Sequence, residues 1–360
     1  MHHQIVLNPA LFQTVASLFK FFRAVGLFPV RYYTRGNLYV LNWSWALYIF
    51  NLIATLLFGS WAAWGYIQDM QIATFTALGF KGSIDVAISA TDVSEVILNN
   101  FNKIDSVIAP ILVKEMRTRS KFVQMFLIVF LPTMYVLDLL MWGNDSWPGV
   151  NNYFAFYVLN FVVNVHQLQY WNFVTLAHAR ILAINRFIKK SSSISEVSHT
   201  RISNIVRSYD CLTESISEIN KCFSGSVAVI VFSCYLHLVT CPYELFVILT
   251  SNESNALNFV SFIWVVLHAC RLFVIVETCN KCQQEIENTK SLVFQLLVCK
   301  LDESVKKEVN TLFFIVTKRK ISFSAFAISK ISRRLFLSIT DSICTYWMVV
   351  LQFTARTIHF

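Results

Sequence analysis

Tyr153 to Leu176 reads YFAFYVLNFVVNVHQLQYWNFVTL and contains no Asp, Glu, Lys or Arg. A helix that crosses the hydrocarbon core of a bilayer, ~30 Å thick, needs about 20 apolar residues, because its backbone hydrogen bonds must all close within the segment. This stretch is long enough and therefore predicts a membrane-spanning helix. Leu41 to Tyr66 is also free of charged side chains and predicts a second one.

The composition extends this prediction to the whole chain. Of its 360 residues, 56% are hydrophobic and 14% are charged, which is more apolar surface than one soluble core can hide. Ile72 to Ile97 contains Lys81, Asp85, Asp92 and Glu95, and it is assigned as a span mainly because the topology requires one there. The remaining predicted spans are Phe122 to Trp142, Gly225 to Thr250, Ala256 to Val276 and Leu335 to Phe353. The sequence therefore predicts an all-α membrane protein with seven transmembrane helices.

The distribution of basic residues predicts how the chain is oriented. Of the 30 Lys and Arg, 27 lie in the N-terminal segment or in the loops after the second, fourth and sixth helices. Such residues concentrate in cytoplasmic loops, so we expect the N-terminus in the cytoplasm and the C-terminus outside, the reverse of a G-protein-coupled receptor. The net charge of +9 follows from these loops rather than from a surface that binds nucleic acid or lipid headgroups. Asn144 and Asn252 begin N-glycosylation sequons in loops predicted to lie outside.

The chain is predicted to form one domain with four parts. Residues 1–40 are a cytoplasmic N-terminal segment, and residues 41–276 are a six-helix bundle with cytoplasmic loops at 98–121 and 177–224. Residues 277–334 are cytoplasmic anchor helices, and residues 335–360 are the last helix with a short extracellular tail. Apolar residues recur mostly at helical spacing in the cytoplasmic parts, at Ile202, Ile205, Val206, Tyr209, Leu212, Ile216, Ile219, Leu292, Leu296, Leu297, Leu312, Phe313, Ile315 and Val316. Two interpretations of these stripes are open: they pack on one another within a subunit, or they form a bundle that also joins subunits.

The last predicted helix carries a polar stripe. At about 100° per residue, one side of the helix collects Asp341, Thr345, Met348, Gln352 and Arg356, with Val349 on its shoulder. Polar groups inside a membrane are costly toward lipid, so they face a water-filled path or the interior of a helix bundle. Both interpretations of the stripe are open at this point.

The same helix contains a motif: Thr345-Tyr346, five apolar residues, then Gln352-Phe353. Behind six predicted spans, this resembles the C-terminal signature of insect gustatory receptors, which the related odorant receptors share in looser form. The resemblance implies a ligand-gated cation channel in the plasma membrane of sensory neurons, homotetrameric or assembled with related receptors. Val349 then forms a hydrophobic constriction and Gln352 the adjacent polar ring of a pore face that also includes Thr345 and Met348. Asp341 either favours cations at the cytoplasmic end or caps the start of the helix.

The resemblance also implies a small-molecule site among the outer halves of the second to sixth helices. In the predicted orientation, the aromatic and polar residues there are Tyr135, Asp138, Trp142, Tyr157, Asn160, Asn164, His237, Tyr243, Glu244 and Trp264. Aromatic walls with a few polar groups suit a small ligand, although packing or a position in the membrane interface would also explain many of them. Asp138 and Glu244 stand out, because a carboxylate in a membrane helix needs a partner or water. Arg271 is a candidate to pair with a carboxylate of the second helix or with Glu277.

The type of ligand is suggested by one position of the motif. In the sugar-sensing branch of the family the residue after Thr-Tyr is typically acidic, whereas here it is Trp347. A bitter-type receptor for a small-molecule tastant is therefore favoured over a sugar receptor. Two other functions stay open: an odorant-receptor-like subunit that needs a co-receptor channel, and a secondary transporter, which the lack of an inverted repeat disfavours.

The sequence offers little that points to catalysis. Cys279 and Cys282 have the spacing of a metal or redox site, but no second Cys or His pair lies nearby, and no phosphate-binding loop or nucleophile elbow occurs. We therefore expect no enzyme activity, no catalytic residue, no metal and no cofactor. The expected partners are the tastant, membrane lipid and other receptor subunits, with no requirement for nucleic acid or a G protein.

Overall fold

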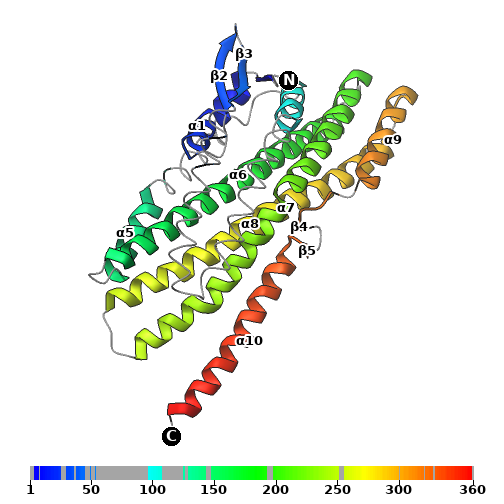
Figure 1. Ribbon diagram of the computed structural model, residues 1–360. Coiled ribbons are helices and arrows are strands. Elements are labelled where there is room, and N and C mark those ends of the chain that lie inside the picture. Colours follow the sequence, from blue (N-terminus) through cyan, green and yellow to red (C-terminus); the bar gives the residue numbers. More distant parts are fainter. Residues whose placement is uncertain are drawn as a thin grey trace.

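Long helices dominate the structure, a computed structural model that describes a large part of the chain. Apart from a few isolated positions, the described residues are 4–7, 9–25, 30–35, 38–44, 96–107, 129–142, 147–192, 198–250, 255–299, 301–319, 321–326 and 329–358. Three helices, α6 (Trp147–Ser192), α7 (His199–Thr250) and α8 (Asn255–Val298), run side by side along the length of the molecule (Figure 1). They are 46, 52 and 44 residues long, well beyond the length a bilayer requires.

Shorter helices cover the two ends of this bundle. The helix α5 (Leu131–Trp142) packs on α6 and α8 at one end, and α9 (Glu303–Lys318) packs on α7 and α8 at the other (Figure 1). The last helix, α10 (Arg333–Ile358), runs from the middle of the bundle toward the end that holds α5. The last residues of α7 and the first residues of α6 and α8 lie at this same end.

The apolar character of these helices confirms the predicted helical membrane fold. Among the described residues, three stretches are long and apolar enough to cross a membrane, His199–Pro242, Phe259–Val298 and Arg333–Gln352, and Leu131–Leu140 is a shorter apolar helix. The helix α6 contains the whole predicted span from Tyr153 to Leu176. The predicted spans Leu41–Tyr66 and Ile72–Ile97 lie mostly outside the described residues, as do the sequon residues Asn144 and Asn252.

A small sheet near the N-terminus differs from the all-α prediction. The strands β1 (Gln4–Leu7), β2 (Val30–Arg35) and β3 (Leu38–Trp43) pair antiparallel in the order β1-β3-β2. The first span was predicted to begin at Leu41, but the structure places that residue in β3, paired with Tyr32 and Ile5. The reason is local: β2 and β3 are rich in β-branched and aromatic residues, which favour strands, whereas the span was assigned from apolar content alone. The helix α1 (Pro9–Val25) covers the sheet through Phe12, whose ring stacks on Tyr39 at 3.8 Å.

The predicted amphipathic stripes are buried within the single chain. On α7, Ile202, Ile205, Tyr209, Leu212, Ile216 and Ile219 are each 1% exposed or less. On α9, Leu312 and Val316 are fully buried, as is Leu296 on α8. These side chains belong to one continuous core with α6. The helices predicted to form a cytoplasmic layer are therefore held together by packing within the subunit. The helices α7 and α8 each run without a break through a part predicted to be cytoplasmic and a part predicted to span the membrane.

A short hairpin connects α9 to α10. Its strands are β4 (Ser324–Ala325) and β5 (Ser329–Lys330), and it is fastened to α7, where the Asn220 side chain accepts a hydrogen bond from the Ser324 N–H at 2.8 Å. Phe326 has φ of 50°, a left-handed conformation, and its backbone N–H donates to the Ser224 carbonyl at 3.2 Å. These bonds fix the point from which α10 leaves the bundle.

Candidate ligand site and pore helix

Five aromatic rings from four helices form one continuous stack, which we call the aromatic column. Tyr157 of α6 stacks on Tyr135 of α5 with centroids 4.9 Å apart, and Tyr135 lies 6.0 Å from Trp264 of α8. Trp264 lies 5.7 Å from His268, which in turn stacks on His237 of α7 at 4.2 Å. The successive ring planes differ by 12° to 20°, so the rings are close to parallel along the whole column.

Polar side chains line the Tyr157 end of the aromatic column. The Tyr157 hydroxyl donates to the Asp138 carboxylate, and both side chains are buried. The Tyr135 hydroxyl donates to Asn160 Oδ1 at 3.1 Å, and Asn164 Nδ2 donates to the same oxygen at 2.6 Å. Asp138 therefore has the partner that an intramembrane carboxylate requires, and this partner is part of the aromatic column.

A buried arginine lies at the other end of the aromatic column. Arg271, 6% exposed, donates from Nε to Gln167 Oε1 at 2.9 Å, and the Gln167 amide donates back to the Arg271 carbonyl at 3.0 Å. Arg271 Nη1 lies 3.5 Å from His268 Nδ1. The expected pairing of Arg271 with Glu277 is wrong, since the Glu277 carboxylate instead accepts hydrogen bonds from Arg333. The carboxylates proposed from the second helix lie outside the described residues.

The structure brings most of the predicted ligand residues together. Seven of the ten belong to the aromatic column or contact it: Tyr135, Asp138, Tyr157, Asn160, Asn164, His237 and Trp264. The side chains of Trp142, Tyr243 and Glu244 lie outside the described part of the chain. That the seven bind a ligand stays a prediction.

Gln167, His268 and Arg271 belong to this cluster but were not predicted as ligand residues, although their spacing in the sequence is a signal. Trp264, His268 and Arg271 are spaced i, i+4, i+7, which places them on one face of α8. Tyr157, Asn160, Asn164 and Gln167 share one face of α6 in the same way. These two faces meet, since Gln167 and Arg271 bond to each other in both directions. A search for polar residues in register along two apolar helices would have found Gln167, His268 and Arg271.

The helix α10, which was predicted to line a pore, presents its polar stripe away from its own bundle. Its packing side is formed by the partly buried residues Phe336, Ile339, Ile343, Trp347 and Val350. At about 100° per residue, the described stripe residues Asp341, Thr345, Met348 and Gln352 lie roughly opposite that side, and all four are exposed. Val349 is 45% exposed, and no residue of the apolar stretch Arg333–Gln352 is fully buried inside the chain. The side chains of Phe353 and Arg356 lie outside the described residues.

One of the two roles predicted for Asp341 is wrong. It was expected either to cap the start of the last helix or to face cations, but α10 begins at Arg333, two turns earlier. Asp341 thus lies inside the helix, where its carbonyl accepts a hydrogen bond from the Thr345 hydroxyl at 2.9 Å. Its exposed carboxylate stays a candidate for contact with cations.

Three contacts tie α10 to the helices that carry the aromatic column. The Arg333 guanidinium donates twice to the Glu277 carboxylate of α8, at 3.0 and 3.1 Å. The Phe336 ring meets Phe273 of α8 edge-on at 6.0 Å. Farther along, the Tyr235 and Ser342 hydroxyls lie 3.2 Å apart. A displacement of α8 or α7 therefore reaches α10 through direct contacts.

Exchanging the charges of the Glu277–Arg333 pair tests this connection. Glu277→Arg places like charges together, so we expect the ligand concentration for half-maximal current to shift about two- to fivefold, the range of a partly exposed ion pair. The double variant Glu277→Arg/Arg333→Glu should restore the original value. Glu287→Arg, which breaks an exposed pair with Lys290 on the same helix, is the matched control. An equal shift in the control would contradict a specific role for Glu277.

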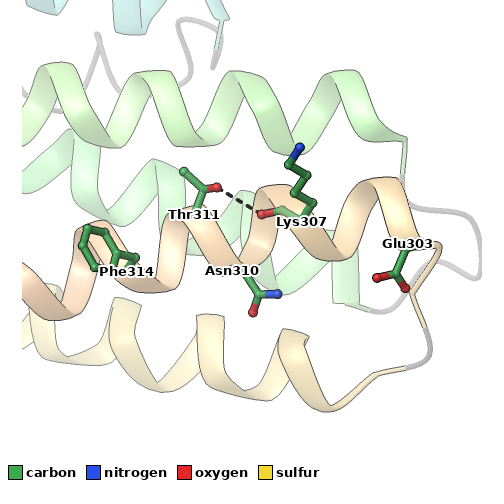
Figure 2. A pocket seen from close by; sticks show the side chains of 5 residues that line it. All are labelled: Glu303, Lys307, Asn310, Thr311 and Phe314. Carbon is green, nitrogen blue, oxygen red and sulfur yellow. Dashed lines mark hydrogen bonds between the residues drawn. The ribbon is translucent and has the colours of Figure 1, made fainter.

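A shallow groove lies on the exposed side of α9, at the end of the bundle opposite α5. Figure 2 shows its lining, which comes from one helix: Glu303, Lys307, Asn310, Thr311 and Phe314. The Thr311 hydroxyl donates to the Lys307 carbonyl at 3.1 Å, and the Phe314 ring is 61% exposed. One acid, one base and one amide spread along a helix that also exposes a ring are typical of a solvated helix face, so we assign no ligand to this groove.

Comparison with known proteins identifies the family. The model of the family described as 7tm Chemosensory receptor matches residues 110–355. This range includes the aromatic column and most of α10. The chain belongs to the 7tm chemosensory receptor family. The prediction that this chemosensory receptor is not an enzyme agrees with its family.

Sequence and structure relatives agree with this family. The chemosensory receptor is 26% identical over 185 residues to gustatory receptor for sugar taste 43a of Drosophila melanogaster, covering 49% of this chain and 41% of that one. The match thus spans less than half the length of that curated relative. The fold resembles insect olfactory receptor OR5 of Machilis hrabei, with a TM-score of 0.63, 13% identity, and coverage of 95% of this chain and 98% of that one. The same receptor in complex with eugenol matches with a TM-score of 0.57 at 11% identity, over 94% and 97% of the chains.

Proposed function

We propose that this chemosensory receptor is an insect gustatory receptor that opens a non-selective cation pore when a tastant binds. The observation that carries the proposal is the orientation of α10. Its polar stripe points away from the bundle, and no residue of its apolar stretch Arg333–Gln352 is fully buried within the chain. A helix of this kind in a membrane requires a partner surface or a water-filled path. Four copies around an axis would supply both, as the resemblance to gustatory receptors implies.

The gate follows from the residues on this side of α10. A ring of Val349 side chains stops ions by dewetting, and a rotation that turns Gln352 inward rewets the pore. Asp341, on the same side and nearer the start of α10, favours cations over anions in this arrangement. The ligand is proposed to bind at the aromatic column, whose motion reaches α10 through Phe336 and Arg333.

The surface of the bundle supports a position in a membrane. Large apolar side chains are exposed on α5 and α8, at Val136, Leu140, Phe259, Phe262 and Phe273, as expected for helices in contact with lipid. From the resemblance to gustatory receptors and from the basic loops we further propose a multi-pass protein of the plasma membrane of sensory neurons, with its N-terminus inside. It acts as a homotetramer or with related receptors.

Replacing Gln352 by phenylalanine tests the pore side of α10. A bulky ring in place of the amide narrows the path and removes its polar ring, so we expect the single-channel conductance to fall by about twofold or more. Leu351→Phe, one residue earlier and therefore turned by about 100°, is the matched control. Both variants must reach the cell surface, which surface labelling measures. If Gln352→Phe leaves conductance and gating unaltered, the proposed pore side is incorrect.

Expression of the chain alone separates the proposal from its rivals. A cation current evoked by tastants, without a G protein and sensitive to changes at Val349 or Gln352, supports a gustatory channel. A current that requires a co-expressed channel subunit favours the odorant-receptor-like alternative. Substrate accumulation without current, which no change on α10 affects, favours a transporter.

The ligand type has two candidates. Trp347 after Thr-Tyr supports a bitter-type receptor, as the motif predicts. A sugar is the second candidate, since the matched Drosophila relative is named a receptor for sugar taste, and stacked aromatic rings beside carboxylate and amide groups also suit a polyhydroxylated ligand. A panel of bitter compounds and sugars on the same cells discriminates the two.

A further inference from the structure

Among the described residues, the guanidinium of Arg271 has no negatively charged partner. Its Nε is bonded to Gln167 and its Nη1 lies beside His268, but Nη2 is buried and has no hydrogen-bond partner. Within the part of the chain that the structure describes, no carboxylate lies within ion-pair distance of this side chain. A buried charge is costly when it is unpaired, and an arginine inside a membrane bundle is usually a functional group.

The surroundings of Arg271 favour one kind of anion. His268 and His237 stack face to face next to the guanidinium, and Trp264, Tyr135 and Tyr157 continue the aromatic column from there. Asp138, the charged group described at the far end of the column, is bonded to Tyr157. A ligand that reaches Nη2 would therefore meet a cation at one end and the side of the aromatic column along its length. His237 of α7 is only partly buried, so part of its ring is exposed at this end of the column.

From this geometry we propose that Arg271 is an anion subsite, and that the receptor takes ligands with a carboxylate on a flat aromatic body. This inference rests on the proposed function, because it names the ligand of the same site. The carboxylate accepts hydrogen bonds from Nη2 and from an imidazole N–H, and the ring lies against the aromatic column. Arginine suits this role because its planar fork matches a carboxylate and it stays charged at all physiological pH values.

Matched acids and amides test the proposal on the full-length receptor. The probes are benzoate against benzamide and phenylacetate against phenylacetamide at pH 7, where acids with pKa values near 4 are ionised. Whole-cell currents should show each acid about tenfold or more potent than its amide, the size expected for a charge-assisted hydrogen bond. In Arg271→Gln the acid and the amide should become equally potent, with Arg271→Lys between the two. Equal potency in the unaltered receptor, or a preference that survives Arg271→Gln, overturns the proposal.

Ligand binding to the purified receptor gives a second measurement that does not require a current. Benzoate should raise the melting temperature of the unaltered receptor more than benzamide or an equal concentration of sodium chloride, and this difference should vanish in Arg271→Gln. If that variant does not fold, the comparison of benzoate, benzamide and chloride on the unaltered receptor decides alone. Stabilisation by chloride and benzoate alike would identify a site for inorganic anions and reject the aromatic acid.

The two experiments separate this inference from the proposed function. A current evoked by a bitter compound or a sugar, with no response to or stabilisation by benzoate, keeps the channel and rejects the anion subsite. Stabilisation by benzoate that depends on Arg271, in a chain that conducts under no condition, keeps the subsite and rejects the channel.

Discussion

Val349→Ser is expected to produce a tonic cation current in cells that receive no tastant. The proposed closed pore excludes water because four valine side chains meet at one level, and serine removes that apolar surface. Burial of one valine side chain accounts for about 1.5–3 kcal/mol, and about 1.4 kcal/mol changes an equilibrium tenfold. The ratio of open to closed channels should therefore rise about tenfold or more, measured as the unstimulated fraction of the maximal current.

Val350→Ser is the matched control for this prediction. It makes the same change one residue later, about 100° around the helix, at a partly buried position on the packing side of α10. We expect it to lower surface expression to some extent and to leave the unstimulated fraction of the current unchanged. A tonic current in Val350→Ser but not in Val349→Ser would mean that α10 is turned the other way in the assembled receptor.

The helical part of the fold could be predicted because its signals are local. A long run of apolar residues such as Tyr153 to Leu176 favours a helix through its own composition, and the stripe from Ile202 to Ile219 predicted its buried side correctly. The sheet of β1, β2 and β3 could not be predicted in this way. Its strands are short, and β1 is separated from β2 and β3 by the whole of α1. Apolar content alone cannot distinguish the end of β3 from the start of a span.

The candidate site was predicted in part, for a related reason. Residue type and depth in the membrane were enough to select Tyr135, Tyr157 and Trp264. The selection missed His268 because it depended on how far α8 is rotated relative to α5 and α7, which packing between helices decides. The position of Arg271 likewise follows from its bonds to Gln167, more than 100 residues away in the chain. Pairings of this range carry no signal in a single sequence.

Asp105→Leu is expected to destabilise the receptor more than any other change considered above. Arg180 of α6 is buried and pairs with Asp105 of the helix 96–107 at 2.6 Å, and its guanidinium also lies 4.0 Å above the Phe101 ring. Removing the carboxylate leaves the buried cation without its counter-charge. The cost should be about 3 kcal/mol, at the lower end for a broken buried pair because the Asp105 side chain keeps 23% of its exposure. Heating the solubilised receptor and following the monodisperse fraction by size-exclusion chromatography measures the loss.

Two further variants separate the unpaired charge from the loss of packing. Asp105→Leu/Arg180→Met removes both charges and should recover most of the lost stability, because an apolar pair replaces a buried ion pair at little net cost. Glu287→Leu deletes the same kind of group from the exposed pair with Lys290, and it should have almost no effect. If the double variant is no more stable than Asp105→Leu, the defect comes from the shape of the leucine side chain. If Glu287→Leu is equally damaging, burial is not what gives the Arg180–Asp105 pair its strength.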